Sequence, residues 1–185
     1  DTNGLGIGFA DELIREQIDD LGNYYPAYGF KNDPDFKKVQ PSHALQILYG
    51  IKANGPLNSK IHSNVFSRVN SGMVKFLIKE QEAKSILLAT KVGQRMPAEK
   101  RIKRLIPHEM TTRLFEEMMN LRLKQTGNGL DIALEQINPR FPKDKYSAFA
   151  YGLWRLKEME EERARKNRRR FGGDSSGKRR LTFFD

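Results

Sequence analysis

Two short segments each place an aspartate where a metal ion or a phosphate group could reach its carboxylate. Asp1 precedes a glycine-rich turn (D-T-N-G-L-G-I-G, residues 1–8) and reads as the end of a strand whose body is missing. Asp144, in K-D-K-Y-S-A, opens the last strong helical pattern. Hard cations such as Mg²⁺ and Mn²⁺ prefer oxygen ligands, and two such ions roughly 3.5–4 Å apart can promote phosphodiester hydrolysis. Asp1 and Asp144 are therefore candidate metal ligands and catalytic residues from two separate elements.

Both aspartates also have a structural explanation. Aspartate is a favoured N-cap, so Asp144 could serve only to cap its helix. Asp1 could be a solvated chain terminus. Two acids are a weak signal for a metal site, and spacing alone does not choose between these interpretations.

The charge of the chain favours a polyanionic partner. The 185 residues carry a formal net charge of +10, and residues 41–185 hold 29 of the basic side chains against 15 acidic ones. Excess positive charge attracts nucleic acid through counterion release. A basic stretch within residues 91–104 is the candidate DNA-binding surface, and we expect its contacts to come from Lys91, Arg95, Lys100, Arg101, Lys103 and Arg104. The alternative is an ordinary solvated basic surface.

Several other chemistries lack their sequence signatures. The chain has no cysteine, which excludes disulfides and thiolate metal sites. It has no P-loop motif, and its three histidines, His43, His62 and His108, show no metal-ligand spacing. No apolar run approaches the roughly 20 residues of a membrane span, so no membrane partner is expected.

The elements that must position these residues alternate between helical and strand patterns, which predicts the α/β class. Apolar periodicity predicts helices over residues 5–19, 59–70, 79–92, 107–125 and 144–166. Ser59 is the expected cap of the second helix. A buried strand is predicted over residues 47–51. Two further strands are predicted over residues 73–78 and 130–135. A loop is predicted over residues 22–41. Residues 1–166 read as one domain, and residues 167–185 as a disordered basic tail.

Several segments, in order along residues 1–165, resemble one protein family. The first is D-T-N-G-L-G-I-G-F-A-D-E-L (residues 1–13). It is followed by K-A-N-G-P-L-N (52–58), S-G-M-V-K-F-L-I (71–78), A-T-K-V-G-Q (89–94) and K-D-K-Y-S-A with Y-G-L (143–153). Together they are similar to the nuclease domain of the large terminase subunit of tailed bacteriophages, in which an acid ends a strand before an Asn-Gly-x-Gly turn.

The resemblance implies an RNase H-like mixed sheet flanked by helices, lacking its first strands in this sequence. It implies a metal-dependent endonuclease, using Mg²⁺ or Mn²⁺, that cuts concatemeric double-stranded viral DNA in the host cytoplasm. Asp1 would be the second metal-binding carboxylate and Asp144 the third. The first acid of the family and the ATPase part of the large subunit would lie upstream, and a small terminase subunit and the portal would be partners. The chain is then expected to be a fragment, one piece of a split gene, or a product whose N-terminal half is supplied separately.

The sequence is also compatible with two non-enzymatic functions. The chain could be a DNA-binding or portal-docking module that uses its basic surface and tail. It could also act as a nucleic-acid chaperone through the tail alone. Metal-dependent cleavage that requires Asp144 distinguishes the enzyme from both.

Overall fold

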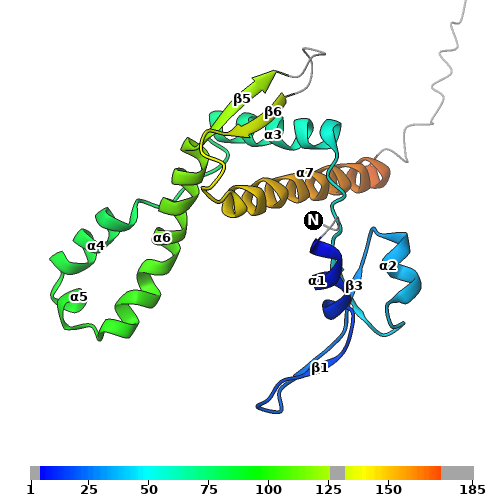
Figure 1. Cartoon of the computed structure of the whole chain (residues 1–185), viewed down its shortest axis with the longest axis horizontal. Helices are drawn as coiled ribbons and strands as arrows, with labels where there is room; N and C mark the ends of the chain where they lie inside the picture. The colour runs from blue at the N-terminus through cyan, green and yellow to red at the C-terminus, as the bar shows by residue number, and fades with distance from the viewer. Residues whose placement is uncertain (1–4, 126–131, 172–185) are drawn as a thin grey trace, which may run out of the picture. The chain divides into compact units, whose positions relative to one another are not determined.

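The computed structural model describes residues 5–125 and 132–171, and Figure 1 shows the arrangement of their elements. The chain divides into two compact units, residues 1–58 and 59–185. The strands pair as three two-stranded sheets, of which β1–β2 and β5–β6 are antiparallel and β3–β4 is parallel. The predicted mixed α/β class is confirmed. In the described ranges no helix is both long enough and apolar enough to cross a membrane.

The first unit packs two helices and a short parallel strand pair around a small apolar core. Its elements are α1 (Leu5–Leu13), β1 (Gln17–Ile18), β2 (Tyr24–Tyr25), β3 (Tyr28–Phe30), α2 (Pro34–Val39) and β4 (Leu45–Leu48). The core comprises Ala10, Ile14, Phe30 and Phe36, with Leu48 packed against it. The rings of Phe30 and Phe36 stack with centroids 4.4 Å apart.

Three expectations for this unit are wrong. The first helix ends at Leu13 and not near residue 19, because Asp19 accepts hydrogen bonds from the backbone amides of Leu21 and Asn23 and shapes a hairpin turn. Within that turn Gly22 has a φ of +82°, which favours glycine. Figure 1 shows the β1–β2 hairpin extending away from α1 and β3. The predicted loop over residues 22–41 contains β2, β3 and α2. Strand β4 is mostly exposed rather than buried, with Leu45 at 50% and Ile47 at 60%.

The residues at the start of α2 explain why a helix forms within the predicted loop. Asp33 is the N-cap and accepts a hydrogen bond from the Asp35 amide at 3.0 Å, and Pro34 follows at the first helical position. The Asp33 side chain is only 3% exposed, and the Lys52 ammonium lies 3.2 Å from its carboxylate. Asn32 exchanges two hydrogen bonds with the backbone of Gly50 and so fastens the chain after β4 to the start of α2.

The second unit is built mainly from helices. Its elements are α3 (Gly55–Asn70), which begins in the first unit, α4 (Glu80–Ala89), α5 (Lys91–Arg95), α6 (Ala98–Met119), β5 (Leu121–Gln125), β6 (Ile132–Gln136) and α7 (Asp144–Phe171). Helices α4 and α6 lie side by side with α5 at their far end (Figure 1). Along α7, the ammonium of Lys157 lies 4.8 Å from the ring centre of Trp154.

Helix α3 begins earlier than expected. The Asn54 side chain accepts a hydrogen bond from the Leu57 amide at 3.0 Å, so the helix starts at Gly55 and Ser59 is not its cap. Ser59 is instead buried within the helix, and its hydroxyl oxygen accepts a hydrogen bond from the backbone amide of Ile132 at 2.9 Å. This bond links α3 to the start of β6.

The strand predicted over residues 73–78 does not form. That segment makes ring contacts instead of strand pairing, because Phe76 packs against Phe115 of α6 at 4.9 Å and against Phe149 of α7 at 5.6 Å between ring centroids. Phe76 therefore packs between two helices, whereas Met73, Leu77 and Ile78 of the same run are exposed.

The long helix expected over residues 107–125 is also displaced. Helix α6 starts at Ala98, contains Pro107 in its interior and ends at Met119. Asn120 explains the end, because its side chain exchanges two hydrogen bonds with the backbone of Asn138, at 2.8 and 3.0 Å. These bonds close the chain into the β5–β6 hairpin, so residues 121–125 form a strand. The predicted strand over 130–135 corresponds to β6, and residues 126–131 lie outside the described ranges.

Candidate functional site

Asp144 is the first residue of α7, as the sequence predicted for the start of that helix. Its side chain is exposed and lies between Lys143 and Lys145 in sequence. A carboxylate in the first turn of a helix is stabilised by the helix dipole and by the free amide groups there. Within the described part of the chain, no hydrogen bond or ion pair engages the Asp144 carboxylate. Its oxygens are therefore available to a ligand.

The capping of α7 is performed by a different acid, Glu117 of α6. One of its carboxylate oxygens accepts a hydrogen bond from the backbone amide of Tyr146 at 2.8 Å. The other lies 3.5 Å from the Lys145 ammonium. Glu117 is only 2% exposed, and a buried carboxylate requires such partners. The interpretation of Asp144 as a pure N-cap is not supported by these contacts.

Tyr146 is held from a second side by His62 of α3. The Tyr146 hydroxyl and the His62 Nδ1 atom are 3.0 Å apart, and the two rings stack with centroids 5.8 Å apart. Burial lowers the pKa of His62, and the positive charge of Lys143 lowers it further. Burial also raises the pKa of Tyr146. Both side chains are therefore neutral at physiological pH, and they share one hydrogen bond.

Only one of the two predicted metal ligands, Asp144, lies within the described residues. Asp144 presents a free carboxylate at the start of a helix, which suits a hard cation. Asp1 lies outside the described residues. Across residues 5–125 and 132–171 no group of three or more histidine, aspartate or glutamate side chains gathers at one point. Asp144 therefore fits a metal as one oxygen ligand of an incomplete set, and the joint role of Asp1 and Asp144 stays a prediction.

The predicted DNA-binding residues lie on two consecutive helices. Lys91 and Arg95 begin and end α5, and the other four lie in the first two turns of α6: Lys100, Arg101, Lys103 and Arg104. Arg101 is partly buried and the other five are exposed. Among the described residues, Lys103 is the only one of the six with an ion-pair partner, Glu99, at 2.9 Å. The structure therefore gathers these cations at one end of the α4–α6 pair.

Close packing holds α5 against α4. The Thr90 hydroxyl accepts a hydrogen bond from the Gly93 amide at 3.0 Å and caps α5. A Cβ atom on Gly93 would collide with the backbone carbonyl of Leu87 in α4. Glycine at this position therefore lets the short basic helix approach α4 closely.

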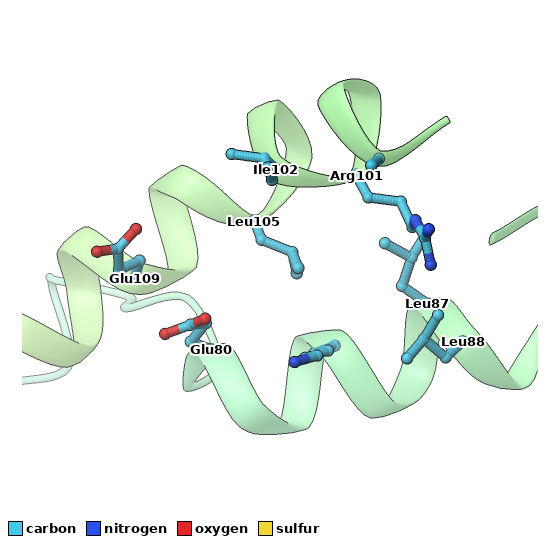
Figure 2. Close-up of a pocket in the computed structure, with 9 residues that line it drawn as sticks. Glu80, Leu87, Leu88, Arg101, Ile102, Leu105 and Glu109 are labelled. Atoms are coloured by element: carbon cyan, nitrogen blue, oxygen red, sulfur yellow. The ribbon is translucent and has the colours of Figure 1, made fainter. Parts of the chain in front are cut away.

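A cavity of about 310 Å³ lies between α4 and α6, and Figure 2 shows its lining. Leu87 and Leu88 of α4 face Leu105 and Ile102 of α6 (Figure 2). Glu80 and Glu109 lie together at one end and Arg101 at the other (Figure 2). Lys84 is a further charged residue of the lining, and the remaining lining residues are apolar.

Comparison with protein-family models, with curated proteins and with solved structures yields no match to this chain. The interpretation of the site therefore depends on its own residues. Sequence reasoning missed Glu117, although a signal was present. Glu117 falls on the apolar stripe that Leu114 and Leu121 predict, and a charged side chain on such a stripe indicates a buried polar contact.

Proposed function

We propose that this chain is part of the nuclease domain of a viral terminase large subunit. It would act as a metal-dependent endonuclease that cuts concatemeric double-stranded DNA during packaging. The proposal includes an RNase H-like arrangement completed by upstream strands. The observation that carries it is Asp144, which stands in the last of several terminase-like motifs with its carboxylate free of the capping role.

In this proposal Asp1 and Asp144 hold Mg²⁺ or Mn²⁺, which when bound activates water and stabilises the leaving oxygen. Glu117 and His62 keep the first turn of α7 in place by their bonds to Tyr146. The basic residues of α5 and α6 contact DNA phosphates. Such contacts position a duplex without reading its sequence, which is sufficient for cutting with little specificity.

Partners follow from the same proposal. The upstream strands of the nuclease domain would supply the first acid of the metal site, and the ATPase part of the large subunit would be a partner. A small terminase subunit and the portal would join the complex, and the basic segment after α7 would contact DNA or the portal.

A plasmid-nicking assay in Mn²⁺ tests the enzymatic role. The wild type and Asp144→Asn are compared, each alone and together with the upstream part of the large subunit. We expect Asp144→Asn to lose nicking and to keep DNA binding, because the substitution removes a metal ligand without adding negative charge. Asp20→Asn, which changes another exposed aspartate, is the matched control and should nick like the wild type. Equal nicking by Asp144→Asn and the wild type would exclude the proposed role of Asp144.

A non-catalytic DNA-binding or portal-docking module is the second candidate. The observation that favours it is the cluster of basic side chains on α5 and α6, which are mostly without ion-pair partners in the described ranges. This candidate predicts DNA binding that neither Mn²⁺ nor Asp144→Asn changes, and no nicking even when the upstream part is supplied.

A further inference from the structure

We infer that Glu117 is a positioning residue whose buried carboxylate fixes the first turn of α7, so that Asp144 is left free to bind a ligand. The inference rests on the proposed function, in which Asp144 is a metal ligand. Glu117 itself is engaged with Tyr146 and Lys145 and touches no reacting group.

The first amides of a helix have no partner within the helix, and a side chain just before the helix usually accepts from one of them. Lys143 precedes α7 and carries no acceptor on its side chain. Glu117 supplies the missing acceptor from another helix, at 2.8 Å from the Tyr146 amide. The cap of α7 is therefore tertiary.

Without Glu117, the acid nearest to these amides in sequence would be Asp144, and aspartate caps helices readily. A carboxylate that turns toward backbone amides commits an oxygen to them. The tertiary cap removes this demand, and the Asp144 side chain remains exposed.

A functional side chain keeps its geometry when packed residues on rigid elements support it. The first turn of α7 is supported by Glu117 from α6 and by His62 from α3, and both contacts meet at Tyr146, which is 5% exposed. Asp144 lies two positions before this anchored residue.

The test uses the full 185-residue chain and four proteins: wild type, Glu117→Gln, Glu117→Leu and Val65→Ala. Gln keeps a hydrogen-bond acceptor, whereas Leu has a similar size and none. Val65→Ala is the matched stability control, because Val65 is buried in α3 and makes none of the capping bonds. Two quantities are measured by NMR: the exchange rate of the Tyr146 amide hydrogen, and the Mn²⁺-induced broadening of the Asp144 resonances.

We expect the Tyr146 amide of Glu117→Leu to exchange at least about tenfold faster than in the wild type, because hydrogen bonds to charged groups are among the stronger ones. The Mn²⁺ concentration needed to broaden Asp144 should rise by a similar factor. Glu117→Gln should restore both quantities toward the wild type. Val65→Ala should lower the melting temperature and leave Mn²⁺ broadening at Asp144 unchanged.

Two outcomes would overturn the inference. One is an unchanged Tyr146 exchange rate in Glu117→Leu, and the other is fast exchange with unchanged broadening at Asp144. If Glu117→Leu does not fold, the wild type still decides, because a through-bond coupling between the Tyr146 amide nitrogen and the Glu117 carboxyl carbon must be present. A wild type that shows no Mn²⁺ broadening at Asp144, with or without the upstream part, refutes the proposed function instead. The exchange rate then still shows whether Glu117 fixes the turn.

Discussion

At the scale of single residues, three buried or partly buried ionisable side chains each contact a residue that is distant in sequence. Glu117 accepts from the Tyr146 amide, Asp33 pairs with Lys52, and His62 shares a hydrogen bond with the Tyr146 hydroxyl. Most buried polar groups have such partners, since an unpaired one costs free energy. Each pair therefore fixes one element against another.

The His62–Tyr146 pair predicts a pH dependence of stability. Burial and Lys143 lower the pKa of His62 in the folded state, so the unfolded chain binds a proton more readily. Stability should therefore fall as the pH drops below the ordinary histidine pKa of about 6.5, and should be unaffected by His62 above it. Thermal melting of the wild type and of His62→Asn, which keeps an acceptor and cannot titrate, measures the effect. The loss of melting temperature between pH 7 and pH 5.5 should be smaller in His62→Asn, and equal losses would contradict the prediction.

In the first unit, the ion pair of Asp33 and Lys52 also makes stability depend on pH. Burial would raise the pKa of Asp33, but the Lys52 ammonium and the amides of Asp35 and Phe36 outweigh burial and hold that pKa below its usual value. The stabilisation is present above the unfolded pKa and is lost as the pH falls through the folded one. We expect Asp33→Ala to lower the free energy of unfolding by about 1–2 kcal/mol through loss of the cap. Asp33→Asn should lose less of the free energy of unfolding than Asp33→Ala, and denaturant titration of both variants measures the difference.

At the scale of elements, the basic face depends on how α5 is held against α4. Thr90 caps α5, and Gly93 allows the approach to the Leu87 carbonyl. Overpacking at a close contact typically costs 1–3 kcal/mol because the backbone must shift. The arrangement of Lys91 and Arg95 is thus sensitive to a single methyl group.

Gly93→Ala is therefore expected to destabilise the chain by about 1–3 kcal/mol, and to weaken DNA binding by displacing α5. Gly152→Ala is the matched control, since a Cβ at Gly152 in α7 meets no atom within 4 Å. That control should gain about 0.5–1 kcal/mol from better helix propensity. Denaturant titration of both variants provides the comparison, and a Gly93→Ala protein as stable as the wild type would rule out the close contact.

Helices were more predictable than strands in this chain, for a physical reason. The stripe of α3, with Ile61 and Val65 buried, follows from residues close in sequence, and the start of α7 at Asp144 does as well. The run over residues 73–78 has the composition of a strand, but a strand needs a partner that local sequence does not reveal. That run packs its Phe76 ring between helices instead.

Parts of the candidate site were beyond prediction for the same reason. The exposed Asp144 could be anticipated from its local pattern, whereas its relation to Glu117 joins residues 29 positions apart. The end of α6 depends on the Asn120–Asn138 bonds, which join positions 18 apart. Tertiary contacts of this kind override helix propensity, and they placed β5 where a helix was expected.

At the scale of the whole molecule, the two units differ in charge. Residues 1–58 carry 5 basic and 8 acidic side chains, whereas residues 59–185 carry 28 and 15. A polyanion should therefore bind the second unit. The electrostatic part of such binding weakens as salt rises, because counterions are released from DNA on binding.

Replacing Lys100 and Arg104 of α6 by glutamine should reduce the slope of log K against log salt by about 1.8, or ~0.9 for each lost phosphate contact. Lys37→Gln with Lys38→Gln in α2 is the matched control, with the same change in net charge in the acidic unit. Fluorescence anisotropy of labelled duplex DNA at several salt concentrations gives the slopes. Similar slopes for the two double variants would place the binding surface elsewhere.

The chain has a single tryptophan, Trp154, and it lies in α7 under the Lys157 ammonium. Indole emission is thus a natural spectroscopic label for residues 59–185, whereas circular dichroism sums over both units. Superimposable melting curves from the two methods would mean that the halves unfold together. Divergent curves would reveal two separate transitions, without any dye or engineered reporter.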